Sequence, residues 1–113
     1  MRIVNDWRGV PAELRGATVA LGNFDGVHLG HAQVLRAAHA ARPDARLAVL
    51  TFEPHPRELF RPDDPPFRLT LSAARAEALA ALGVETVFEL PFDYDFSMMS
   101  AEDFVTKVLA EGL

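Results

Sequence analysis

The sequence has 113 residues, 50% of them hydrophobic and 24% charged, with a formal net charge of −5 at pH 7, which suits one small globular domain. The negative charge argues against a general nucleic-acid binder and no apolar run is long enough to span a bilayer, so we expect neither nucleic acid nor a membrane as a partner. The lack of cysteine excludes disulfides and thiolate metal sites, and the N-terminus lacks the apolar core of a signal peptide, so we expect a cytoplasmic protein.

Strand-like and helix-like segments alternate along the chain. A short β-like start at residues 2–4 precedes a loop or single turn, and short apolar runs predict strands at 18–22, 46–53 and 84–90. Helices are predicted at 29–41, 71–82 and 100–111, and residues 92–99 are expected to form an irregular, aromatic-rich loop. This alternation predicts an α/β fold, with a parallel sheet between helices on both faces.

The segment from Gly22 to His31, GNFDGVHLGH, lies where the strand at 18–22 turns into the following helix. His28 and His31 are three residues apart at the helix start, so their side chains share one face. A helix N-terminus favours phosphate oxygens, and Gly30 lets a nucleotide approach the backbone closely. Nucleotidyl transfer needs positioning and charge neutralisation rather than a covalent intermediate, and two histidine donors could supply both.

Other interpretations of this segment stay open. One histidine could cap a loop while the other lies on the surface. The pair could also form half of a metal site, although the sequence has no cysteine and its only further histidines are His39 and His55. Asp25 could help to place a cation or substrate, but an aspartate followed by glycine is also a common turn pair.

Two prolines end the strand at 46–53. Pro54 and Pro56 cannot donate to a sheet ladder, so the strand ends in a rigid loop at 53–56. This loop falls at the carboxyl edge of the sheet, where doubly wound sheets bind ligands. Phe52 beside it could contribute to a binding site or belong to the core.

Three blocks of sequence carry a resemblance to a known family. They are GNFDGVHLGH (22–31), LTFEPHPRELF (50–60) and FDYDFSMMSAEDFV (92–105). In this order and spacing they resemble the FMN adenylyltransferase domain of the bacterial bifunctional riboflavin kinase/FAD synthetase family, within the HxGH nucleotidyltransferase superfamily. The resemblance implies a Rossmann-like, HUP-type, three-layer α/β/α fold. It also implies transfer of AMP from ATP to FMN, with Mg²⁺, to give FAD and pyrophosphate.

The resemblance also implies roles for individual residues. His28 and His31 would contact the ATP phosphates and act in catalysis. The ATP-binding set would be Gly22, Asn23, Phe24, Asp25, Gly26, His28, Gly30 and His31. The flavin-binding set would be Phe52, Glu53, Pro54, His55, Pro56, Phe92 and Tyr94. The aromatic residues could stack on the isoalloxazine ring or pin their loop to the core, and no residue is assigned to a metal.

The chain lacks two further blocks of the family and its riboflavin kinase module. The absent blocks are a segment containing D-F-R-F and a Ser/Thr-rich segment that ends in arginine. Residues 1–113 are therefore expected to be the N-terminal part of the domain, weakly active or inactive alone. The free edge of the strand at 18–22 makes self-association a reasonable hypothesis. Alternatives are a nucleotide- or flavin-binding module without turnover, or an HxGH adenylyltransferase whose acceptor is nicotinamide mononucleotide or phosphopantetheine.

Overall fold

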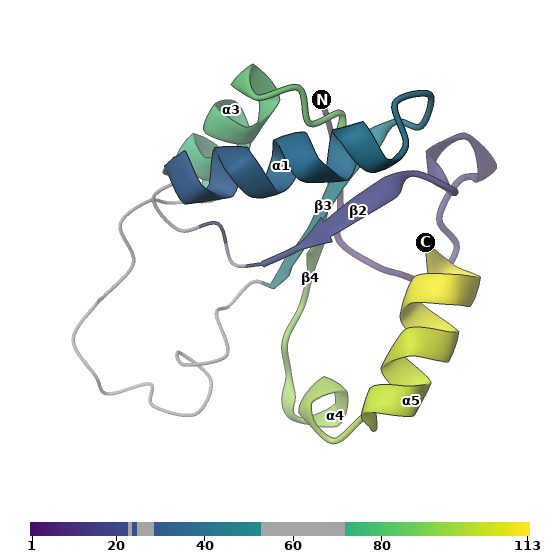
Figure 1. Cartoon of the computed structure of the whole chain (residues 1–113). Coiled ribbons are helices and arrows are strands. Elements are labelled where there is room, and N and C mark those ends of the chain that lie inside the picture. Colours follow the sequence, from purple (N-terminus) through teal and green to yellow (C-terminus); the bar gives the residue numbers. More distant parts are fainter. Residues whose placement is uncertain (23, 25–28, 53–71) are drawn as a thin grey trace.

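A four-stranded parallel sheet forms the centre of the protein (Figure 1). The computed structural model describes residues 1–22, 24, 29–52 and 72–113. The strands are β1 (Arg2–Val4), β2 (Thr18–Leu21), β3 (Leu47–Phe52) and β4 (Thr86–Leu90), in the spatial order β1-β4-β3-β2. The predicted parallel sheet is confirmed, and the short N-terminal strand pairs at its far edge beside β4.

The two central strands are the most apolar and the most buried. Every residue of β4 is buried, as is every residue of β3 up to Thr51. Continuous apolar runs suit strands that are covered on both faces, because both sets of alternating side chains then lie in a core. By contrast, β2 pairs only with β3 within the described residues, so it is an outer strand of the sheet, as predicted.

Helices cover both faces of the sheet (Figure 1). The helices α1 (Leu29–Ala41) and α3 (Ser72–Ala81) pack on one face, and α5 (Ala101–Asp103) with η2 (Phe104–Gly112) packs on the other. The first core consists of Ala20, Phe24, Leu35, Leu47, Val49, Leu79, Val84 and Val87. The second consists of Ala48, Leu50, Phe88, Leu90, Val108 and Leu113. The three-layer arrangement is confirmed, and within the described ranges no helix is both long and apolar enough to cross a membrane.

Helix boundaries follow the expected local signals. The single turn near the N-terminus is a 3-10 helix, η1 (Ala12–Leu14). Gly83, with φ of 92°, follows α3 and ends it, because this left-handed backbone conformation favours glycine. The predicted cap of the last helix is present, since the backbone N–H of Asp103 donates to Ser100 Oγ at 3.1 Å. From Phe104 onward, however, this helix is π-helical, which the sequence does not predict.

The prediction of an irregular loop at 92–99 is wrong for its central residues. Residues Tyr94–Ser97 form one helical turn, α4. The turn forms because the Asp93 carboxylate accepts a hydrogen bond from the backbone N–H of Phe96 at 2.8 Å, which makes Asp93 its N-cap. The sequence does not predict this helical turn, because alternating aromatic and acidic residues are typical of extended chain rather than of a helix.

Candidate functional site

The turn between β2 and α1 follows the carboxyl end of β2 and is anchored by Phe24. The Phe24 side chain is 2% exposed and belongs to the core under α1. Its φ of 53° lies in the left-handed region, which costs a non-glycine residue roughly 1–2 kcal/mol. Burial of the ring offsets this strain, so the packed side chain anchors the chain at residue 24. Backbone strain of this kind is concentrated at functional sites.

The Phe24 ring leaves little room for a side chain at position 22, which accounts for Gly22. A Cβ atom at Gly22 would lie 3.0 Å from Cε2 of Phe24, tighter than ordinary van der Waals contact. The N–H of Gly22 also donates to the carbonyl of Leu50 at 3.1 Å, which extends the pairing of β2 with β3 by one residue. Gly22 therefore lets the chain leave the sheet while the aromatic ring closes over it.

His31 lies in the first turn of α1, next to Phe24. The two ring centroids are 5.0 Å apart and the rings are inclined at 49°. His31 is half-buried and Gly30 is exposed, and both lie in the first turn of α1, where the partial positive charge of the helix is concentrated. The structure thus brings together Gly22, Phe24, Gly30 and His31 of the predicted ATP set. Asn23, Asp25, Gly26 and His28 lie outside the described residues.

Aromatic residues meet beyond the ends of β3 and β4. The Phe52 ring lies 5.3 Å from that of Phe92 and 5.4 Å from that of Phe96, and Phe96 lies 6.0 Å from Phe104. Phe52 and Phe96 pack against the core under η2, as expected if Phe52 belongs to the core and residue 96 holds its segment in place. Tyr94 is 65% exposed.

The remaining residues of the predicted flavin set are Glu53, Pro54, His55 and Pro56. All four lie outside the described residues. Their contribution to the site therefore stays a prediction, as does a flavin-binding role for Phe52, Phe92 and Tyr94.

A buried ion pair lies close to the same edge and was not predicted. Arg75 Nη2 of α3 is 3.7 Å from Glu89 Oε2 of β4, and the two side chains are 2% and 8% exposed. The available signal was Glu89 itself, a carboxylate in an otherwise apolar strand. Pairing with a helix that begins 17 residues earlier in the chain cannot be read from local spacing.

A cavity of about 300 Å³ lies beyond the ends of β1 and β4. It is lined by Asp6, Trp7, Arg8, Pro91, Asp93, Asp95, Phe96 and Met99. Arg8 lies over the Trp7 ring, and its hydrogen bond to Asp6, 2.9 Å long, holds the pKa of that carboxyl below its usual range. The lining has three carboxylates and one guanidinium, so its net charge is negative and repels the phosphates of a nucleotide. This cavity is therefore a poor candidate for an ATP site.

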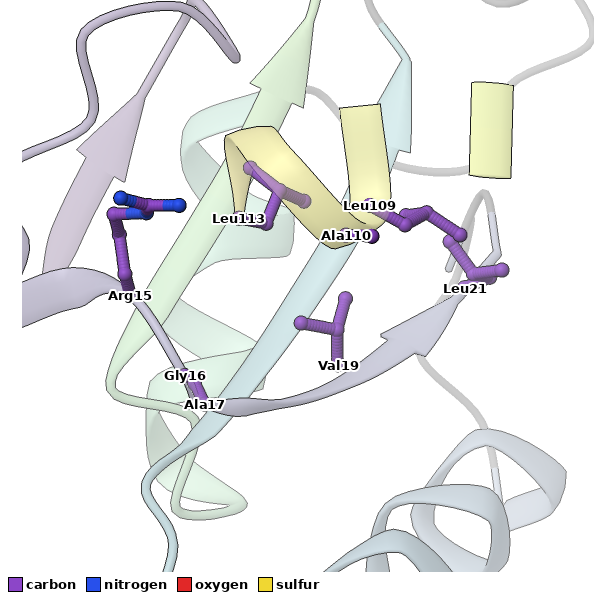
Figure 2. A pocket seen from close by; sticks show the side chains of 8 residues that line it. All are labelled: Arg15, Gly16, Ala17, Val19, Leu21, Leu109, Ala110 and Leu113. Atoms are coloured by element: carbon purple, nitrogen blue, oxygen red, sulfur yellow. The ribbon is translucent and has the colours of Figure 1, made fainter. Parts of the chain in front are cut away.

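A second cavity, of about 430 Å³, lies between β2 and η2 (Figure 2). It is lined by Arg15, Gly16, Ala17, Val19, Leu21, Leu109, Ala110 and Leu113. Val19 points toward η2, whereas Ala20, the next residue, packs under α1 with Phe24. The cavity is therefore on the opposite face of the sheet from Phe24 and His31, and its lining is mostly apolar.

Metal ligands can be assessed for the described part of the chain. Within it, no group of three or more histidine, cysteine, aspartate or glutamate side chains could hold a metal ion. His39 is exposed on α1. The interpretation of the histidines as half of a metal site is not tested, because His28 and His55 lie outside the described residues.

Comparison with known proteins identifies the family. A sequence model described as FAD synthetase matches residues 10–113. A bifunctional riboflavin kinase/FMN adenylyltransferase of Pseudomonas fluorescens is 38% identical over 118 residues, which cover 100% of this chain and 37% of the relative. Its counterpart in Escherichia coli K12 is 36% identical over 104 residues, or 90% of this chain and 33% of the relative.

The fold is also found in a solved structure. A crystal structure described as a macrolide-efflux protein from Streptococcus pneumoniae matches with a TM-score of 0.73 and 29% identity, over 93% of this chain and 36% of that chain. The chain therefore spans about a third of the length of these proteins. The match over residues 10–113, together with the parallel sheet and the turn that leads into α1, shows that the chain belongs to the FAD synthetase family.

Proposed function

We propose that this chain carries the adenylyl-transfer site of an FMN adenylyltransferase, which transfers AMP from ATP to FMN. The observation that carries the proposal is the turn between β2 and α1, where Phe24 is buried in a left-handed conformation beside His31. The names of the relatives agree with this activity. ATP would enter as its Mg²⁺ complex, and the reaction would take place in the cytoplasm.

The reaction needs no covalent bond to the protein. An oxygen of the FMN phosphate attacks the α-phosphorus of ATP, the bond from that phosphorus to the bridging oxygen breaks, and pyrophosphate leaves. Negative charge builds on the phosphate oxygens during this step. His28 and His31 would donate hydrogen bonds to these oxygens, and the first turn of α1 would add its N–H groups and partial positive charge.

The acceptor would lie along the same edge of the sheet, beyond β3 and β4. Phe52 and Phe92 provide aromatic surface there, and the exposed Tyr94 ring extends it. We place the flavin against these residues and the segment 53–56. Because the carboxyl ends of parallel strands share one edge, ATP at the end of β2 and FMN at the ends of β3 and β4 would meet.

Separate His28→Ala and His31→Ala variants test this function. Each should lower kcat for FAD formation by about 100- to 1,000-fold, because a donor to the developing charge is lost. FMN binding, followed by quenching of flavin fluorescence, should be retained. His39→Ala is the matched control, since His39 is an exposed histidine of the same helix, and it should leave turnover unchanged.

The same assay separates the alternatives. Nicotinamide mononucleotide and phosphopantetheine should release no pyrophosphate from ATP. Wild-type turnover with either of them but not with FMN would reassign the acceptor. Binding of FMN without any turnover, even by the protein at its natural length, would support a binding module. Stoichiometric zinc in the purified protein, lost from the two histidine variants, would support a metal site.

A further inference from the structure

The ion pair between Arg75 and Glu89 occupies a position where an apolar pair would be expected. Arg75 is one helical turn before Leu79 on α3, and Leu79, at 0% exposure, packs into the core on the same face of the sheet. The side chains of Arg75 and Glu89 are 2% and 8% exposed, so both charged groups are largely removed from water. On the face of α3 that meets the sheet, a buried arginine thus lies one turn before a buried leucine.

Glu89 connects several elements at the carboxyl edge of the sheet. It is in register with Thr51 of β3, which is buried on the same face. Its carbonyl accepts a hydrogen bond from Asn5 Nδ2 at 3.2 Å, from the residue that follows β1. Through its side chain it also meets Arg75 of α3. One residue therefore links the ends of three strands to one helix.

A buried ion pair is a poor means of gaining stability. Desolvation of two charges offsets their attraction, so a well-packed apolar pair is often at least as stable. Loss of one partner, however, leaves a buried unpaired charge. The pair therefore fits a role in specificity rather than in stability. Two charged groups that must meet hold α3 and β4 in one relative position, whereas apolar side chains would permit several.

We propose that Arg75 and Glu89 are positioning residues for the FMN acceptor. The residues that follow Thr51 and Glu89 in register are Phe52 and Leu90, and Phe52 contacts Phe92 just beyond β4. The ion pair fixes the end of β4 against α3, and thereby the placement of Phe52 and Phe92. The turn after β2 is farther away, because β3 separates β2 from β4 in the sheet. This inference rests on the function proposed above.

The experiment compares KM for FMN and for ATP in the protein at its natural length. The double variant R75M/E89L replaces the pair by apolar groups, and should keep a wild-type circular dichroism spectrum and a melting temperature close to that of the wild type. Its KM for FMN should rise about tenfold while its KM for ATP stays within about twofold. Arg75→Lys keeps a charge but not the planar guanidinium, and should raise KM for FMN about threefold. Glu77→Gln, on the exposed side of α3, is the matched control and should change neither value.

Two results would overturn the inference while leaving the proposed function intact. The first is a KM for FMN within twofold of the wild type in the double variant, or in Arg75→Lys should the double variant fail to fold. The second is an equal rise of both KM values, which would indicate a purely structural pair. Absence of FAD formation by the wild-type protein at its natural length would instead overturn the proposed function, and this inference with it.

Discussion

At the scale of single residues, Phe24 and Gly22 determine how the chain leaves β2. Gly22→Ala should destabilise the protein by about 1–3 kcal/mol, because the added Cβ meets a buried ring that has little room to move. The φ of Gly22 is not in the left-handed region, so crowding rather than backbone strain is the cause. The free energy of unfolding, measured in urea, tests this prediction.

A double-mutant cycle identifies the crowded atom. Phe24→Leu removes Cε2, so Gly22→Ala should cost at least about 0.5 kcal/mol less in the Phe24→Leu background than in the wild type. Additive effects of the two substitutions would show that crowding by the Phe24 ring is not the reason why position 22 requires glycine.

At the scale of elements, the cap of α5 sets where the C-terminal helix begins. Ser100→Ala should lower the free energy of unfolding by about 1 kcal/mol, because the N–H of Asp103 loses its acceptor. Ser100→Asp keeps an acceptor at that position and should retain the wild-type stability. Equal stability of the alanine and aspartate variants in thermal unfolding would contradict the importance of this cap.

The elements were largely predictable because apolar runs and caps are local signals. The strands at 47–52 and 86–90 and the helix at 29–41 follow from such signals. The π-helical form of η2 does not, because its hydrogen bonds leave little trace in composition. In the structure, Val108 and Leu113 are both buried, and the N–H of Leu113 donates to the carbonyl of Val108, five residues earlier.

The candidate site was predictable in part. The motif from Gly22 to His31 correctly placed the junction between the end of β2 and the start of α1, because glycine and histidine at such a junction are a local pattern. The buried ring of Phe24 and its left-handed backbone depend on α1 packing over the sheet, which no spacing within the motif reveals. The ion pair of Arg75 and Glu89 was missed for the same reason, since its partners come from different layers.

At the scale of the whole molecule, the described residues give β2 a partner strand on one side only, and an apolar cavity lies beside this strand (Figure 2). Unpaired N–H and C=O groups on such an edge can pair with a second copy, so we predict that this chain self-associates there. Leu21→Lys introduces a charge at the edge, on a side chain that is 54% exposed, and should weaken the association. Sedimentation velocity over a range of concentrations measures it.

A matched substitution elsewhere controls for the added charge. Val34→Lys, on α1, changes a side chain that is 49% exposed and should not affect self-association. A wild-type chain that sediments as a monomer at every concentration would contradict the prediction.

The pairing of β1 with β4 has a consequence for the order of folding. β1, near the N-terminus, pairs with β4, which follows β2 and β3 in the chain. The hydrogen bond from Asn5 to Glu89 joins residues 84 positions apart. Contacts of such long range are slow to form, because a large loop must close before they stabilise anything. During synthesis β2, α1 and β3 can associate while β1 still has no partner. We therefore expect β1 to join the sheet after β2 and β3 have paired, although it precedes both in the chain.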